Sequence, residues 1–365
     1  MSTTTSTPPS AASSTRTLGV VMILLTLAGW TSIPLFLRHF ATGEHAIDAW
    51  TANGWRYGVS ALMWAPVLLI GLVRGTLPAG LWRAALVPSI FNIIAQIAFA
   101  IAPYLVGPGL MTFSMRLQII FLTVGAAVLF PAERKVIRTL GYILGISMVV
   151  AGTAVTLLLK PEGLGGGTAL GVIISIAAGL FYAAYGLAVR KWMQGFHPFT
   201  AFAAVSQYTA AAIVALMLLL GDDHGLTAWR LPPWEFTMLM LSAIIGIGLG
   251  HTLYFASISR LGLAVSAGVI QLQPITVSIG SMFLFDELLT RGQWAGGIVA
   301  IAGAVIMLVA QHRLAKAARI ADPQIPPTDA VLCAHCGYDL EGVEPDSPCP
   351  ECGRVNTTTR SAQNR

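Results

Sequence analysis

The chain has 365 residues, of which 55% are hydrophobic and 10% charged, and its formal net charge is +5. A soluble protein of this length needs more charge to solvate its surface, so the composition excludes a soluble globular domain and indicates a membrane protein. The apolar runs are continuous over roughly twenty residues, which excludes a β-barrel, because barrel strands alternate apolar and polar residues.

The first apolar run follows Arg16 and continues past Pro34 without a small-residue cleavage site, so we interpret it as a transmembrane helix and not as a signal peptide. Residues 1–15 are rich in Ser, Thr and Pro, which is typical of a disordered tail. A helix needs roughly 20 apolar residues to cross the hydrocarbon. The sequence predicts ten such spans, near residues 18–38, 52–73, 84–104, 108–130, 139–159, 168–189, 198–220, 235–256, 262–285 and 293–312.

Basic residues gather in alternate loops, which predicts the orientation of the spans. With the N-terminus in the cytoplasm, the inner loops hold most of the Arg and Lys residues. The outer side then holds only Arg38, Arg56, Lys160, Arg230 and Arg291. We therefore expect a multi-pass protein in the lipid bilayer of the cytoplasmic (inner) membrane, with both termini cytoplasmic. The net charge reflects this bias, and no nucleic-acid partner is expected.

The spans contain an internal repeat, because landmarks of the fourth and fifth spans recur 155 positions later in the ninth and tenth. Each half holds five helices, so the second half must enter the membrane from the opposite side. The sequence thus predicts an all-α polytopic fold of two inverted five-helix repeats, residues 16–160 and 161–315, with a shared central site. The recurring landmarks are Gly107 and Gly262, Leu117-Gln118 and Leu272-Gln273, Gly125 and Gly280, Leu129-Phe130 and Leu284-Phe285, and Gly141 and Gly296.

The closing stretches of both halves, 117–152 and 272–303, resemble the EamA family of the drug/metabolite transporter superfamily. The first copy departs from the pattern, because its acid, Glu133, is shifted by one position and Ile119 replaces a proline. The resemblance covers about residues 16–315 and implies a ten-helix transporter of a superfamily that exports amino acids, drugs, sugars and other metabolites. The motifs that carry it are Gln273-Pro274, Phe285-Asp286-Glu287, Trp294-Ala295-Gly296-Gly297, Phe130-Pro131-Ala132-Glu133, Gly141-Tyr142 and the Arg-aromatic pair Arg56-Tyr57.

Arg116 is the strongest candidate for substrate binding, because it lies near the middle of the fourth span. Placing a guanidinium there costs at least ~2.5–3.5 kcal/mol on insertion scales, so we expect it to face a polar cavity or a partner. Its repeat counterpart Gln271 and the nearby Gln273, beside Pro274, are further candidates for substrate binding. A guanidinium that faces a water-filled cavity can form paired hydrogen bonds with a substrate carboxylate or phosphate. The alternative is an arginine held by backbone carbonyls purely for packing.

Asn92 and Gln96 lie one turn apart on one face of the third span. At the repeat displacement Gln96 corresponds to His251 in the eighth span, so these side chains are further candidates for substrate binding at the repeat interface. The alternative is interhelical hydrogen bonding, worth about 0.6 kcal/mol each. No carboxylate lies near the middle of any span, so we expect transport to be either uncoupled or proton-coupled through His251.

Other polar and small residues have simpler interpretations. Glu133 and Glu287 are expected to be solvated caps at helix ends, and Arg56 is expected to extend from an outer aromatic belt into the interface. Four glycines are expected to permit close helix packing instead of contacting substrate. They are Gly141, Gly145, Gly296 and Gly297.

The four cysteines form two C-x-x-C-G knuckles, Cys333/Cys336 and Cys349/Cys352. Four thiolates at this spacing predict a structural Zn²⁺ site in a compact zinc ribbon over residues 331–355, with iron as an alternative. Disulfides are disfavoured in a cytosolic tail. Residues 316–330 are predicted to be a stiff linker and residues 356–365 a disordered end.

These features predict a transporter, by resemblance an exporter, of small amino-acid-like or other charged metabolites. The alternative is a non-transporting membrane anchor or sensor that acts through the zinc ribbon, for which a protein partner is expected. The spans carry no Ser/His/Asp set, paired acids or open metal site, so no enzyme is expected. A homodimer is compatible with the sequence.

Overall fold

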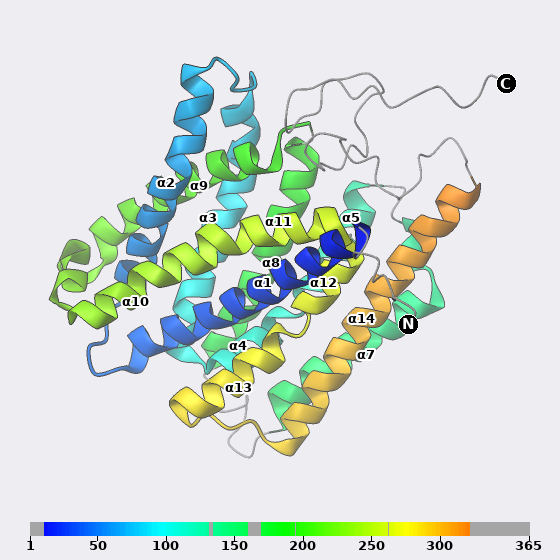
Figure 1. Cartoon of the computed structure of the whole chain (residues 1–365). Helices are drawn as coiled ribbons and strands as arrows, with labels where there is room; N and C mark the ends of the chain where they lie inside the picture. Colours follow the sequence, from blue (N-terminus) through cyan, green and yellow to red (C-terminus); the bar gives the residue numbers. More distant parts are fainter. Residues whose placement is uncertain (1–10, 131–133, 160–168, 194, 262, 322–365) are drawn as a thin grey trace, which may run out of the picture.

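A computed structural model of the chain describes residues 11–130, 134–159, 169–193, 195–261 and 263–321, and every regular element in those residues is a helix (Figure 1). Ten helical stretches are long and apolar enough to cross a membrane, so all ten predicted spans are confirmed to within a few residues. They are Thr17–Thr42, Ala49–Val73, Leu81–Leu105, Pro108–Leu129, Leu140–Leu158, Ala169–Trp192, Phe199–Leu220, Pro233–Ile258, Val265–Phe285 and Arg291–Leu314.

Seven of these spans are single helices, whereas the fourth, eighth and ninth are each built from more than one helical segment. The elements are, in chain order, α1 (Ala11–Thr42), α2 (Ala49–Val73), α3 (Leu81–Leu105), α4 (Pro108–Met115), α5 (Gln118–Leu129), α6 (Arg134–Ile137), α7 (Leu140–Leu158), α8 (Ala169–Trp192), α9 (Pro198–Leu220), the 3₁₀ helix η3 (Asp222–Arg230), α10 (Pro233–Ala243), the π-helix η4 (Ile244–Leu249), α11 (Gly250–Leu261), α12 (Leu263–Ile270), α13 (Gln273–Phe285) and α14 (Arg291–Ala321).

The breaks in the fourth and ninth spans occur at corresponding positions of the sequence. The fourth is interrupted at Arg116-Leu117 and the ninth at Gln271-Leu272, which are 155 positions apart. Pro274 lies in the first turn of α13, where its missing N–H removes no helical hydrogen bond. The fourth span has no such proline, so its break has another cause.

The eighth span contains the π-helix η4 between α10 and α11, and there the Gly250 N–H bonds to the carbonyl of Ile245, five residues earlier. The wider turn brings neighbouring spans close to its glycines. A Cβ on Gly246 would lie 2.6 Å from side-chain carbons of Ile33 in α1. π-Helical turns are rare and frequently lie at functional sites.

Helices α7 and α14 lie side by side at one edge of the bundle (Figure 1) and touch through glycines. A Cβ on Gly152 would lie 2.5 Å from the carbonyl oxygen of Gly296, and one on Gly303 would lie 2.5 Å from that of Gly145. Small residues at such contacts let two backbones approach within the membrane. The packing role predicted for Gly145 and Gly296 is confirmed.

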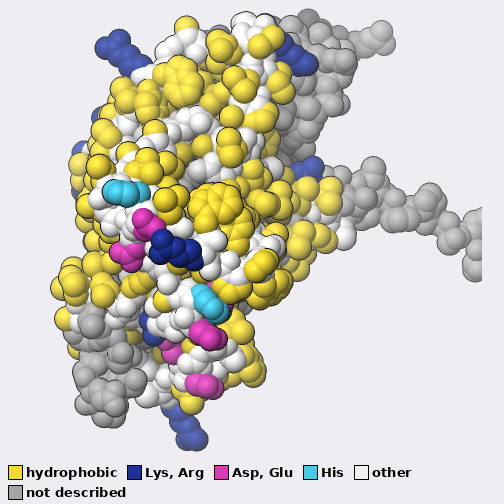
Figure 2. Space-filling view, turned by 90° about the vertical axis from the view of Figure 1, so that its left-hand side faces the viewer, with side chains coloured by type: hydrophobic (Ala, Val, Ile, Leu, Met, Phe, Trp, Pro, Cys, Tyr) yellow, Lys and Arg dark blue, Asp and Glu magenta, His cyan; other side chains and the backbone are white. Residues whose placement is uncertain are grey.

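The outside of the bundle is largely apolar, as a lipid-facing surface must be. Phe283 and Leu219 are each 76% exposed, although a soluble protein would bury such side chains. Figure 2 shows hydrophobic side chains over most of one face, with the acidic and histidine side chains gathered in its middle and lower part and Lys and Arg side chains also at its top and bottom. The chain is a multi-pass membrane protein.

The contact between α7 and α14 predicts a stability difference between two glycines of α7. Gly152→Ala should lower the thermal unfolding midpoint of the purified protein in detergent, because the added methyl group would overlap the backbone of α14; overpacking typically costs about 1–3 kcal/mol. Gly141→Ala is the matched control, because a Cβ there would meet only the Cβ of Ala310 at 3.5 Å. Equal midpoints for the two variants would contradict backbone contact at Gly152.

Candidate functional site

The breaks in the fourth and ninth spans meet at the side chain of Arg116. Its Nη1 donates to Oε1 of Gln271 at 3.1 Å and its Nη2 donates to Oε1 of Gln273 at 3.1 Å. Its Nε donates to the Thr112 carbonyl at 3.4 Å. The guanidinium is therefore held mainly by two side-chain amides of the facing span, so three of the predicted site residues lie together.

His251 is linked to this cluster through Trp30 of α1. Gln273 Nε2 donates to the Trp30 carbonyl at 2.8 Å, and the Trp30 ring meets the His251 ring edge-on at 5.4 Å. On its other side His251 stacks on Phe202 at 4.5 Å, and its Nδ1 lies 3.2 Å from the Ile247 carbonyl in η4. The imidazole thus lies between aromatic rings of α1 and α9, directly after the π-helix.

The two predicted residues of α3 form a separate polar group. Asn92 is buried, and its Nδ2 donates to Oγ1 of Thr209 in α9 at 2.9 Å. The backbone carbonyl of Gln96 accepts from Nδ2 of Asn53 in α2 at 3.3 Å. Among the described residues the Gln96 side chain makes no hydrogen bond. Substrate binding by all six predicted residues stays a prediction.

Arg56 does not extend into the interface, and that expectation was wrong. The residue is 2% exposed, and Nε and Nη1 of its guanidinium have no hydrogen-bond partner. The predicted second span begins at residue 52, so Arg56 lay near its end and its position carried no clear signal for burial. The neighbouring Tyr57 is also buried, with 2% exposure.

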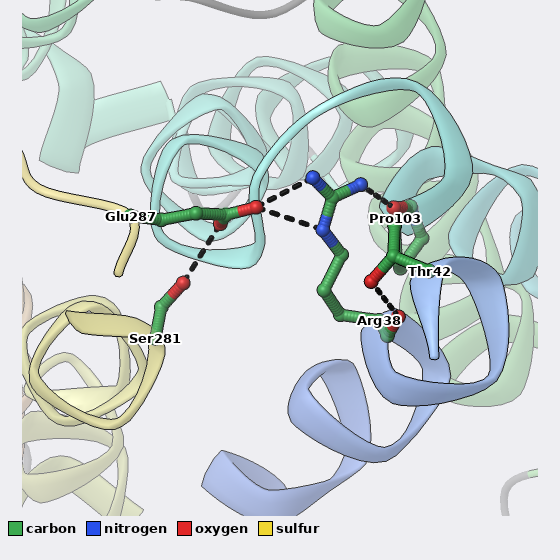
Figure 3. A network of polar contacts seen from close by, with 5 residues as sticks. All are labelled: Arg38, Thr42, Pro103, Ser281 and Glu287. Carbon is green, nitrogen blue, oxygen red and sulfur yellow. Dashed lines mark hydrogen bonds and ion pairs between the residues drawn. The ribbon is translucent and has the colours of Figure 1, made fainter. Parts of the chain in front are cut away.

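Glu287 is not a simple solvated cap, because it forms an ion pair with Arg38 of α1 (Figure 3). Arg38 Nε donates to Glu287 Oε1 at 2.8 Å, and Arg38 Nη1 donates to the Pro103 carbonyl of α3 at 2.7 Å. Ser281 of α13 donates to the other carboxylate oxygen at 2.8 Å. The pair therefore joins the ends of α1, α3 and α13, a link that the sequence did not predict.

The zinc-ribbon cysteines and Glu133 lie outside the described residues. Within the described ranges, no group of three or more His, Cys, Asp and Glu side chains could hold a metal ion.

Comparison with known proteins agrees with this architecture. Residues 169–309 match the EamA-like transporter family. Among the solved structures 27 chains match, and one of them, named only as "Crystal structure of protein", is 18% identical, covers 83% of this chain and 99% of its own, and has a TM-score of 0.55. That likeness shows a shared fold alone. None of the curated proteins matches the chain. Residues 169–309 of this multi-pass membrane protein thus resemble the EamA-like transporter family.

Proposed function

We propose that the protein transports small charged metabolites, in the export direction, by alternating access of two inverted halves around the Arg116 cluster. The observation that carries this proposal is the meeting of two broken spans at one guanidinium. A membrane anchor needs no broken helices, because unpaired backbone groups are tolerated in a membrane only where they face protein or a water-filled path. Transporters place substrate sites at such breaks.

The electrostatics of the cluster favour an anionic group on the substrate. Helices α5 and α13 both begin beside Arg116, at Gln118 and Gln273, and a helix N-terminus attracts negative charge. The partners of Arg116 are neutral amides and a carbonyl, so its charge is not cancelled by an acid. A substrate carboxylate could replace one amide while keeping the guanidinium hydrogen-bonded.

The Arg38–Glu287 pair supplies the closure that alternating access requires on the outer side. It joins α1 and the end of α13 beside Gly107, where a Cβ would meet the Glu287 carboxylate carbon at 3.1 Å. A substrate leaving toward this side would have to separate the pair. By the distribution of basic loops, this end of the bundle faces away from the cytoplasm.

The first experiment is metabolite profiling inside and outside cells that overexpress wild type or Arg116→Ala at matched membrane abundance. We expect at least one compound to accumulate outside only with wild type, because the variant loses the charge at the meeting point of the breaks. Arg291→Ala is the matched control, since Arg291 is exposed at the start of α14.

Equal profiles for the variant and wild type would remove Arg116 from the transport path. If neither wild type nor any variant exports a compound, the alternative is favoured, an anchor or sensor that acts through its tail.

The same metabolite profiling of His251→Gln under an imposed pH gradient tests whether transport is coupled to protons. A full gradient response in that variant would contradict coupling through His251.

Glu287→Gln should open the outer end of the protein more often, because the amide loses the ionic part of its contact with Arg38. We expect a membrane-impermeant thiol reagent to label a cysteine introduced at Gln96 faster in this variant, with the four native cysteines replaced by serine. Asp286→Asn is the control, because it removes the adjacent exposed charge and Asn tolerates the left-handed backbone there. Unchanged labelling in Glu287→Gln would argue against a gate.

We also propose that Cys333, Cys336, Cys349 and Cys352 bind one structural Zn²⁺, on the strength of their spacing. Metal analysis of the purified protein should give about one zinc per chain, as expected for a four-thiolate site. Cys349→Ser/Cys352→Ser should lose the zinc and keep export, because the site lies beyond the spans. Iron in place of zinc, or no metal in the wild type, would contradict the assignment.

A further inference from the structure

Arg56 of α2 is a buried cation whose hydrogen bonds are not satisfied by the protein. It is 2% exposed, and Nε and Nη1 have no acceptor. Arg38 and Arg116 differ from it, because Arg38 is paired with Glu287 and Arg116 bonds to Gln271 and Gln273. A buried donor without an acceptor loses its hydration and gains nothing in return, so this arrangement is destabilising.

The surroundings of Arg56 contain no compensating acid. The ionisable side chains that act on Arg56 are the tyrosines Tyr57, Tyr104 and Tyr182, from α2, α3 and α8, and none of them is an acid that is charged at neutral pH. No ion pair to Arg56 occurs in the part of the chain that the structure describes. A single positive charge without a facing acid matches one carboxylate, which can accept from the guanidinium nitrogens.

Asn53 lies one turn earlier on the same face of α2 and has an unsatisfied acceptor, where Arg56 has unsatisfied donors. It is 2% exposed, and its Oδ1 accepts no hydrogen bond. Its Nδ2 donates to the Gln96 carbonyl, which fixes the amide orientation and leaves Oδ1 as a free acceptor. An unsatisfied acceptor beside unsatisfied donors suits a ligand that carries both an anion and an N–H group.

The wall next to Arg56 is the π-helix of the eighth span. A Cβ on Gly246 would lie 3.6 Å from Nη2 of Arg56, so this face of the guanidinium is bordered by a glycine. The Ile33 side chain of α1 packs against the same glycine, so α1, α2 and the π-helix meet beside the guanidinium, and π-helical turns are frequently at functional sites.

We propose that Asn53 and Arg56 form a second substrate site, made of other residues than the Arg116 cluster, which binds an amino-acid head group, with Arg56 holding the carboxylate and Asn53 Oδ1 accepting from the ammonium. This inference rests on the proposed transport function and names its substrate class. A phosphate dianion is the poorer match, because a second negative charge would meet no second cation in the described surroundings of Arg56.

The test is thermal unfolding of the purified full chain in detergent with each of the common amino acids. Each is compared with its C-terminal amide, which lacks the carboxylate, and with its N-acetyl derivative, which lacks the ammonium. We expect at least one amino acid to raise the midpoint of the wild type and both of its derivatives to fail. Arg56→Gln should weaken that binding about 10- to 100-fold, as expected for a lost charge-assisted hydrogen bond.

Arg56→Gln should also leave the ligand-free midpoint unchanged or higher, because it removes an unpaired buried charge. A purely structural arginine would instead lower the midpoint. Asn53→Ala is a second variant that keeps the charge and should also weaken binding, whereas Arg291→Gln, on the exposed surface, should bind as wild type.

The proposal is overturned if no amino acid stabilises the wild type, if the amides stabilise equally, or if binding survives Arg56→Gln. Stabilisation by inorganic phosphate alone would also overturn it. Failure of this site is distinguishable from failure of transport. Export without amino-acid binding refutes the site alone, and amino-acid binding without export by any variant refutes transport alone.

Discussion

The structure depends on a single constraint: polar groups within the membrane must find partners inside the protein. At Arg116 the constraint is met by pairing two interrupted spans, each of which supplies what the other lacks. The guanidinium provides donors, and Gln271 and Gln273 provide acceptors. Gln273 then donates to the backbone of α1 at Trp30, so a third span joins the centre. Each break alone would destabilise its span, but the two breaks stabilise each other because their polar side chains form hydrogen bonds together.

The same constraint makes the exceptions informative. Arg38 is fully engaged, with Glu287 and the Pro103 carbonyl, whereas Arg56 and Asn53 retain unsatisfied atoms deep in the bundle. Unsatisfied buried polar atoms are uncommon in native proteins, and each asks for an explanation. The Arg38–Glu287 pair lies at one end of the bundle, whereas Arg56 and Asn53 lie among the spans. These positions are consistent with two separate roles, closure of the path by the ion pair and ligand binding by the unsatisfied atoms.

The number, type and approximate ends of the spans could be predicted, because twenty continuous apolar residues have one stable arrangement in lipid. Arg116 and Gln271 could be recognised as repeat counterparts, but their contact emerged only from the structure. The break beside Pro274 had a local signal, but the break at Arg116 had none, since Ile119 occupies the proline position. The Arg38–Glu287 pair joins residues far apart in the chain and depends on how the spans pack. The burial of Arg56 could not be read from hydropathy, because an arginine near a span end satisfies the rules for an interfacial anchor equally well.

The contact between α7 and α14 has a mechanical consequence. Gly145 and Gly152 touch Gly303 and Gly296 at backbone distance, so a shift of one helix along the other would bring the two backbones into collision. One helix closes the first half of the chain and the other closes the second. A rigid contact between the two halves would act as a fixed pivot. Any rocking of one half against the other would then be largest in the spans farthest from this contact. Motion would then be largest in α2, α9 and α10, which lie on the opposite side of the bundle from the α7–α14 edge (Figure 1).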